Sequence, residues 1–264
     1  MNAAPLGVFD SGIGGLTVAR ALFERLPRES VIYFGDTARV PYGPKSPDTV
    51  RRYSGEILAF LLQRGVKAVV VACNTSTAHA LDSLQHQSPV PVVGVIEPGA
   101  RAAVAATRTG NIGVIGTAGT IASGAYERAI KALRADACVQ SRPCPLFVPL
   151  VEEGWFEHPA AELIAREYLE PLRRARVDVL VLGCTHYPLL KALLARVMGA
   201  EVKLVDSAEE TAKVVATELE QRGLLANGGR HDHHFVVSDD EPHFRKVGAL
   251  FLGEKLKRVE VVPL

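Results

Sequence analysis

Residues 66–73 have the sequence VKAVVVAC, and residues 177–184 have the related sequence VDVLVLGC. Both stretches are almost continuously apolar, which is typical of parallel strands covered on both faces. A second pair, LGVFDSG at 6–12 and IGVIGTA at 112–118, matches in the same order at nearly the same offset. These matches favour two similar α/β halves, each of which places one cysteine where a strand meets the next helix. General similarity among strand–helix units is the alternative explanation.

Short β-branched runs alternate with helical patterns along the whole chain. We expect strands at 6–10, 31–36, 67–73, 92–96, 111–116, 146–150, 178–183, 202–206, 234–238 and 258–262. Ser46 and Pro47 provide an N-cap and a first turn for a helix over 48–63. Repeated units of this kind predict an α/β protein with doubly wound parallel sheets, which bind ligands at the carboxyl ends of their strands. The last segment is expected to pack back on the first half as an extra strand and helix.

The composition excludes several classes of protein. The chain has 264 residues, of which 48% are hydrophobic and 22% charged, values that exclude a disordered or low-complexity chain. The formal net charge of +1 creates no long-range field that would favour nucleic acid or an acidic membrane. The apolar runs are too short to span a membrane, and the N-terminus has no basic region followed by an apolar core. We therefore expect a cytoplasmic protein that binds neither nucleic acid nor membrane.

The four cysteines fit a cytosolic protein, because they are too few for a disulfide scaffold and form no CxxC pair. Most such cysteines are inert and buried, and Cys138 and Cys144 have no other interpretation. Cys73 and Cys184 differ, because each follows a buried strand and precedes a helical segment. The positive end of a helix favours the thiolate, so we expect an appreciable thiolate fraction at neutral pH. One such thiol suggests a nucleophile, whereas two on matched halves suggest a pair that acts on opposite faces of one substrate.

Polar residues next to these cysteines are candidate binding groups. Asn74, Thr75 and Thr185 offer amide and hydroxyl groups that can bind a carboxylate at a helix end. His186, two residues after its cysteine, can hold or relay a proton. Glu152 and Glu153 can meet a substrate ammonium group, although a solvated pair is the simpler interpretation.

Other motifs have weaker interpretations. The segment DSGIGG at 10–15 resembles an anion-binding turn, but it matches neither the dinucleotide fingerprint nor a hydrolase elbow. The polar segment 34–45 is either a binding loop or a surface crossover. The run HDHH at 231–234 lacks the spacing of known metal ligands, so no metal site is expected.

Seven motifs together resemble the glutamate racemases, a family of the cofactor-independent amino acid racemase superfamily. The resemblance extends from residue 7 to about residue 212 and is much less specific after about 224. The motifs are GVFDSGIGGLTV (7–18), YFGDTARVPYGPKS (33–46), ACNTSTA (72–78), GVIGTAGTI (113–121), PLFVPLVEEG (145–154), GCTHYPLL (183–190) and VDSAEETA (205–212). The resemblance implies two pseudo-symmetric α/β domains with the active site between them. We place the first domain at 1–96 plus 207–264 and the second at 97–206.

The resemblance also implies roles for individual residues. Cys73 and Cys184 would be the catalytic acid/base thiols, assisted by Asp10 and His186 respectively, with Asp36 and Glu152 as further acidic groups near the site. Glutamate would be bound by Asp10, Ser11, Pro41, Tyr42, Gly43, Asn74, Thr75, Thr117, Thr185 and His186. The implied reaction needs no cofactor and supplies D-glutamate for peptidoglycan, and a homodimer is possible.

Two thiols suit this reaction for a chemical reason. Inverting a stereocentre requires one group to remove the Cα proton on one face and another to deliver a proton on the opposite face. No pyridoxal lysine motif provides an electron sink, so we expect hydrogen bonds from Asn74, Thr75, Thr117 and Thr185 to the carboxylate to stabilise the deprotonated substrate. Two alternatives stay open. One is a racemase with the same two-cysteine arrangement that acts on aspartate or another small amino acid, and the other is a non-catalytic redox or binding protein.

Overall fold

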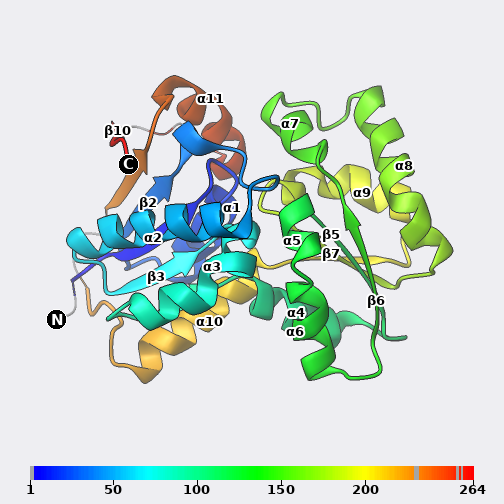
Figure 1. Ribbon diagram of the computed structural model, residues 1–264, viewed down its shortest axis with the longest axis horizontal. Coiled ribbons are helices and arrows are strands. Elements are labelled where there is room, and N and C mark those ends of the chain that lie inside the picture. The colour runs from blue at the N-terminus through cyan, green and yellow to red at the C-terminus, as the bar shows by residue number, and fades with distance from the viewer. Residues whose placement is uncertain (1–2, 229–231, 254–255, 257) are drawn as a thin grey trace.

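The computed structural model describes residues 3–228, 232–253, 256 and 258–264, and it consists of two α/β domains side by side (Figure 1). The first domain is built on a six-stranded parallel sheet of order β10-β9-β2-β1-β3-β4. Its strands are β1 (Leu6–Asp10), β2 (Val31–Gly35), β3 (Ala68–Val71), β4 (Val92–Gly94), β9 (His233–Val237) and β10 (Val259–Val261). Its helical elements are α1 (Leu16–Arg25), the 3₁₀ turn η1 (Thr37–Arg39), α2 (Pro47–Gln63), α3 (Asn74–Gln87), α10 (Ala208–Gln221) and α11 (Glu241–Leu252).

The second domain is built on a four-stranded parallel sheet of order β6-β5-β7-β8. Its strands are β5 (Asn111–Gly116), β6 (Cys138–Pro143), β7 (Val179–Gly183) and β8 (Lys203–Asp206). Its helical elements are α4 (Ile96–Ala106), α5 (Ala118–Ala122), α6 (Ala125–Leu133), α7 (Phe147–Glu152), α8 (Pro159–Arg174), the 3₁₀ turn η2 (Tyr187–Leu190) and α9 (Lys191–Met198). In Figure 1 this domain is almost wholly green to yellow, whereas the first domain contains both the first strand, β1, and the last, β10.

The two sheets repeat one topology. The order β2-β1-β3-β4 in the first sheet corresponds strand for strand to β6-β5-β7-β8 in the second. The two pairs of similar sequences fall on β1 with β5 and on β3 with β7. The internal repeat predicted from the sequence is therefore present in the fold, and it places Cys73 and Cys184 after equivalent strands.

The central strands are apolar throughout because both of their faces are covered. Along β1, Leu6 and Val8 contribute to one hydrophobic cluster, while Phe9 contributes to another on the opposite face. Along β3, Val70 belongs to the first cluster and Val69 to the second. Successive side chains of a strand point to opposite faces, so a strand between two helical layers requires apolar residues at every position.

The predicted strand at 146–150 is wrong, because residues 147–152 form helix α7. Phe147, Leu150 and Val151 are its buried residues, and their spacing has the period of a helix and not of a strand. The sixth strand is instead β6, which the apolar-run criterion missed. β6 lies at the edge of its sheet and is largely exposed, so its sequence CVQSRP contains no apolar run.

The other expected elements are present within a few residues of their predicted ends. Ser46 caps α2 as predicted, since its hydroxyl accepts a hydrogen bond of 3.3 Å from the Thr49 amide. The C-terminal segment packs on the first domain and adds β9, α11 and β10, in agreement with the strands expected at 234–238 and 258–262 and with the expected helix.

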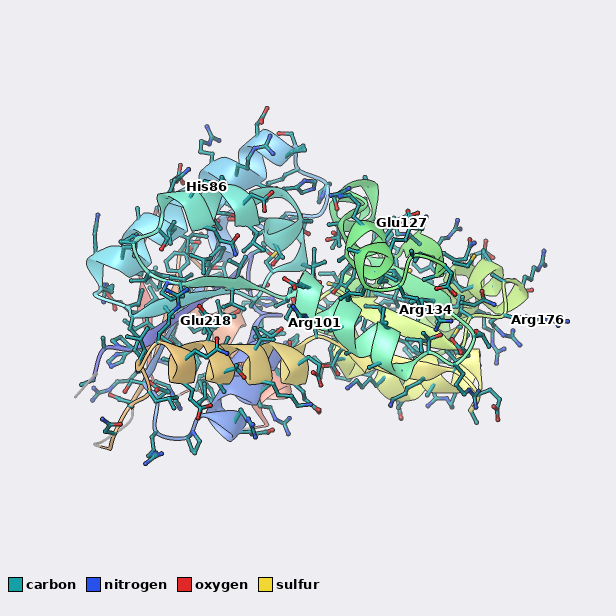
Figure 2. All side chains as sticks on the ribbon, turned by 90° about the horizontal axis from the view of Figure 1, so that it is seen from below. His86, Arg101, Glu127, Arg134, Arg176 and Glu218 are labelled. Carbon is teal, nitrogen blue, oxygen red and sulfur yellow. The ribbon has the colours of Figure 1, made fainter. Side chains whose placement is uncertain are left out.

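Charged side chains of both signs project from the face shown in Figure 2. Acidic Glu127 and Glu218 lie on the same face as basic Arg101 and Arg134, in keeping with a net charge near zero. Among the described residues, no helix combines the length and apolar character required to cross a membrane.

Candidate functional site

The two cysteines singled out in the sequence occupy the carboxyl ends of β3 and β7. Cys73 is the N-cap of α3, and its Sγ accepts a hydrogen bond of 3.4 Å from the backbone amide of Ser76. Cys184 follows β7 directly and precedes η2, with its Sγ 4.0 Å from Nδ1 of His186. Only Cys73 therefore caps an α-helix, which is a difference between the two otherwise similar halves.

Both thiols line one cavity of about 390 Å³ between the domains. It is lined by Ser11, Gly12, Val40, Pro41, Tyr42, Gly43, Pro44, Cys73, Asn74, Thr75, Thr117, Ala118, Pro145, Val148, Pro149, Glu152, Cys184, Thr185 and His186. The structure thus brings together all the predicted site residues except Asp10 and Asp36, which lie behind the lining residues. A cavity of this volume suits a small molecule.

Asp10 lies fully buried beneath the glycine-rich turn that follows β1. Its carboxylate accepts a hydrogen bond of 3.0 Å from the Gly12 amide and one of 3.4 Å from the Thr185 hydroxyl of the other domain. Burial raises the pKa of Asp10, against the opposing effects of His186 and of the hydrogen bonds that it accepts. The carboxyl group therefore joins the two halves directly behind the cavity wall.

Asp36 is also fully buried, and its carboxylate is joined to the cavity lining through a hydrogen bond with Tyr42. Its carboxylate accepts hydrogen bonds from the Tyr42 hydroxyl, from Nε of Arg39 at 2.7 Å and from the Ser238 hydroxyl at 2.8 Å. All four groups belong to the first domain. Asp36 therefore anchors the loop that carries Tyr42 and Gly43 to the cavity.

The expected thiolate character of Cys73 is wrong for the free protein. Burial raises the pKa of Cys73 to about 11, and the like charge of Asp10 adds to the effect. The hydrogen bond from the Ser76 amide acts in the opposite direction but is outweighed. The favourable helix end is thus opposed by desolvation, and Cys73 holds its proton at neutral pH.

Cys184 lies in a different electrostatic environment. Nε2 of His186 lies 2.9 Å from Oε1 of Glu152, and Nδ1 of the same ring faces the Cys184 sulfur. Burial lowers the pKa of His186, but the hydrogen bonds and charges of Cys184 and Glu152 outweigh burial and raise it to about 10. A protonated imidazole therefore faces Cys184, whereas a carboxylate lies near Cys73.

The rate of alkylation at different pH values should show that Cys73 is protonated at neutral pH. Below a pKa of about 11, the thiolate fraction grows about tenfold per pH unit, so the initial rate of Cys73 carboxamidomethylation by iodoacetamide should rise in that proportion between pH 7 and pH 9. Peptide mass spectrometry of briefly treated protein measures this rate, and exposed Cys138 in the same sample controls for reagent activity. A Cys73 rate that stays constant over this range would contradict the assignment.

Hydrogen bonds across the domain boundary close the cavity. The Gly119 amide donates to the carbonyl oxygen of Gly43 at 2.8 Å, and the hydroxyl groups of Thr75 and Thr117 lie 2.9 Å apart. These pairs join residues 43 and 75 of the first half to residues 117 and 119 of the second. The binding groups of the two halves are therefore held in register by direct contacts.

Part of the cavity lining was not anticipated from the sequence. Val40, Pro44, Pro145, Val148 and Pro149 form an apolar portion of the wall. Val40 and Pro44 lie in the candidate binding loop at 34–45, and the other three lie in the motif at 145–154, but no pattern marked these five residues as binding groups. Apolar walls exclude water, which strengthens the electrostatic interactions inside a closed site.

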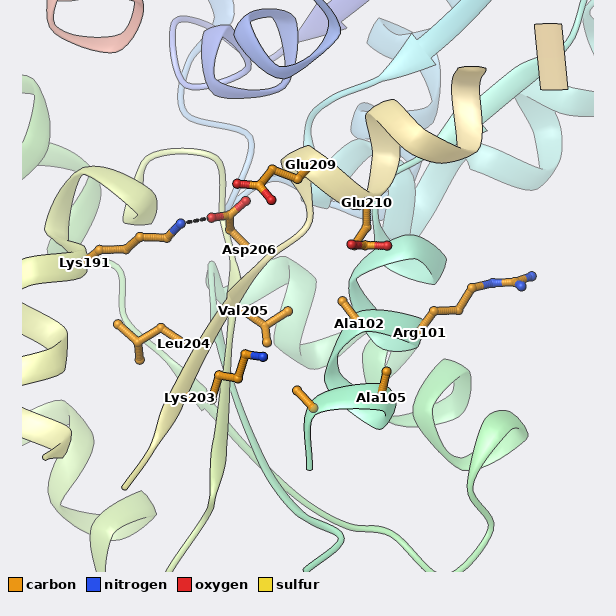
Figure 3. A pocket seen from close by; sticks show the side chains of 11 residues that line it. Arg101, Ala102, Ala105, Lys191, Lys203, Leu204, Val205, Asp206, Glu209 and Glu210 are labelled. Atoms are coloured by element: carbon orange, nitrogen blue, oxygen red, sulfur yellow. Dashed lines mark ion pairs between the residues drawn. The ribbon is translucent and has the colours of Figure 1, made fainter. Parts of the chain in front are cut away.

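A second cavity, of about 490 Å³, lies between α4, β8 and the start of α10 (Figure 3). Its charged side chains are Arg101, Lys191, Lys203, Asp206, Glu209 and Glu210, and Lys191 forms an ion pair with Asp206. The cavity contains no thiol, and its acidic and basic groups are equal in number. The smaller cavity with the two cysteines is therefore the candidate active site.

Comparison with known proteins gives consistent results. The profile of the Asp/Glu/Hydantoin racemase family matches residues 11–215. The glutamate racemase of Geobacter metallireducens is 58% identical over 98% of this chain and 96% of its own length. The crystal structure of a glutamate racemase from Bacillus anthracis has a TM-score of 0.96 at 41% identity, covering 100% of this chain and 99% of that one. The Francisella tularensis glutamate racemase, solved in complex with D-glutamate, has a TM-score of 0.94 at 39% identity, covering 99% and 98%.

Proposed function

The chain belongs to the Asp/Glu/hydantoin racemase family, and we propose on this premise that the cavity with Cys73 and Cys184 is its active site. The protein is an isomerase that interconverts L-glutamate and D-glutamate. The observation that supports the site most strongly is that two cysteines from matched halves of the chain line a single small cavity.

The proposed reaction removes the Cα proton on one face of the substrate and replaces it with a different proton on the opposite face. A thiolate on one side removes the Cα proton, so that a new S–H bond forms and the electron pair of the C–H bond remains on the substrate. The thiol on the other side then donates its proton to the opposite face of Cα. Each thiol ends in the protonation state that the other had at the start, and no external reagent is consumed.

Stabilising the deprotonated substrate is the difficult part of this reaction. The charge of the carbanion spreads into the α-carboxylate, so donors directed at that carboxylate lower the barrier. Asn74, Thr75, Thr117 and Thr185 all line the cavity and supply such donors. Buried Asp10 and the pair Glu152–His186 assist one thiol each, while Asp36 is a positioning residue that acts through Tyr42.

Solvent isotope exchange tests the substrate assignment. In D₂O, the purified protein should incorporate deuterium at Cα of L-glutamate while optical rotation falls to zero, because the two enantiomers have equal free energy. L-Aspartate, one methylene shorter, should react at least about tenfold more slowly, the discrimination that one methylene commonly gives. Proton NMR and polarimetry measure both effects. Faster exchange with aspartate would support an aspartate racemase instead.

Cellular context follows from the activity. We propose that the enzyme works in the cytoplasm and supplies D-glutamate for peptidoglycan, in keeping with four free cysteines among the described residues. The domain limits at 96/97 and 206/207 remain a prediction, as does a homodimer.

A further inference from the structure

The side-chain amide of Asn74 has a hydrogen-bond partner at its oxygen but, among the described residues, none at its nitrogen. Its Oδ1 accepts a hydrogen bond of 2.7 Å from the hydroxyl of Tyr126. Its Nδ2 is buried without a protein partner, although Asn74 is only 2% exposed and lines the thiol cavity. A buried donor without a partner is costly and suggests that a ligand satisfies it.

Tyr126 belongs to the opposite domain and does not line the cavity. It lies on α6, is 2% exposed, and extends its hydroxyl across the domain boundary to α3. Its position leaves little freedom: a Cβ added at Gly183 would lie 3.0 Å from the tyrosine ring, and one at Gly99 would lie 3.1 Å from the hydroxyl oxygen. The ring thus packs against the backbone just before Cys184.

The contact between Tyr126 and Asn74 has a defined direction. The phenol hydroxyl donates to Oδ1 of Asn74, and an amide accepts a hydrogen bond only through its carbonyl oxygen. The amide nitrogen of Asn74 is consequently the end left for a ligand.

We propose that Tyr126 is a positioning residue that fixes the Asn74 amide so that its N–H groups face the α-carboxylate of the substrate. This inference deepens the proposed function and rests on it. A flipped amide would direct a carbonyl oxygen at a carboxylate, so the effect of Tyr126 is a matter of orientation as well as of packing. Because the tyrosine belongs to the second domain, the donor becomes correctly oriented only when the two halves are in contact.

The variant Tyr126→Phe removes only the hydroxyl group. We expect kcat/KM to fall roughly tenfold for both enantiomers, the effect of leaving one buried polar group unsatisfied or misdirected. Tyr187→Phe is the matched control, since that buried tyrosine also donates one hydrogen bond of 2.8 Å, to the carbonyl oxygen of Cys144, and lies outside the cavity lining. The control should lose a similar amount of thermal stability but keep its kinetic constants.

Two further measurements separate orientation from general structural damage. In the Asn74→Ala background, Tyr126→Phe should have no additional effect on kcat/KM, because its target is absent. In direct binding measurements by calorimetry, Tyr126→Phe should weaken glutarate but not 4-aminobutyrate, which has the substrate skeleton without the α-carboxylate. Equal loss of both ligands, or additive kinetic effects of the two substitutions, would overturn the inference.

The calorimetric binding measurements require no turnover. The proposed function and the role of Tyr126 can therefore be tested separately. Absence of racemisation by the unaltered enzyme would overturn the proposed function, while the comparison of glutarate with 4-aminobutyrate would still test Tyr126. Normal racemisation by Tyr126→Phe with unchanged glutarate affinity would overturn the role of Tyr126 and leave the proposed function intact.

Discussion

Replacing either Cys73 or Cys184 with serine is expected to lower kcat/KM for glutamate racemisation by about 10²- to 10⁴-fold, the usual contribution of a positioned acid or base. A serine hydroxyl has nearly the shape of a thiol but is a far weaker acid, so it neither ionises to remove the Cα proton nor delivers one readily. Polarimetry with each enantiomer measures the loss. Since the enantiomers have equal free energy, kcat/KM must fall equally in both directions in each variant.

A reaction that needs only one thiol should distinguish the two variants. With 3-chloroglutamate, removal of the Cα proton leads to loss of chloride, and no proton has to be delivered on the opposite face. Each variant retains a base on one side of the cavity only. We therefore expect Cys73→Ser and Cys184→Ser to retain chloride release from opposite enantiomers of this substrate, as measured with a chloride electrode.

The appropriate control is Cys138→Ser, because Cys138 is exposed on the edge strand β6 and is absent from the cavity lining. That variant should racemise at the unaltered rate. If both cavity variants lost chloride release from both enantiomers, misfolding would be the better explanation. Unchanged racemisation by either cavity variant would exclude the two-thiol mechanism.

The sequence predicted the buried strands, because a strand that is covered on both faces consists of a run of apolar residues. β3 and β7 lie between two helical layers, so every residue in them is apolar, and the polar residues that follow belong to the ligand-binding edge. The two cysteines were therefore identifiable by position alone. Their roles and the substrate came from motif resemblance, because strand position carries no information about the reaction.

Features that depend on packing between distant residues were not predictable. β6 was missed because an exposed edge strand requires no apolar run, and the helix at 147–152 was mistaken for it. The protonated state of Cys73 depends on burial and on Asp10, neither of which is visible in a helix-capping pattern. Tyr126 is 52 residues from Asn74 in the chain and lies in the other domain, so no local pattern links them.

A second large loss of activity is expected from Gly14→Ala, which adds a single methyl group at the domain boundary. A Cβ at Gly14 would lie 2.3 Å from Oγ1 of Thr185 and 2.4 Å from Nδ1 of His186, distances that require something to move. Neither side chain is free to move, since Thr185 donates to Asp10 and His186 contacts Glu152. Gly14→Ala should therefore separate the halves or displace His186, and a misplacement of about 1 Å can reduce the rate 10²-fold. Measurement of kcat/KM for both enantiomers checks this loss.

Gly55→Ala provides the control, because it makes the same chemical change within α2, where a Cβ would meet nothing within 4 Å. It should raise the free energy of unfolding by about 0.5–1 kcal/mol through the loss of backbone freedom and leave activity unchanged. Gly14→Ala should remain folded, since the clash lies between the domains and not within either sheet. Its thermal unfolding transition should therefore persist while activity is lost. If Gly14→Ala instead racemised glutamate at the unaltered rate, close contact between the glycine turn and His186 would not be what holds the two thiols in their catalytic positions.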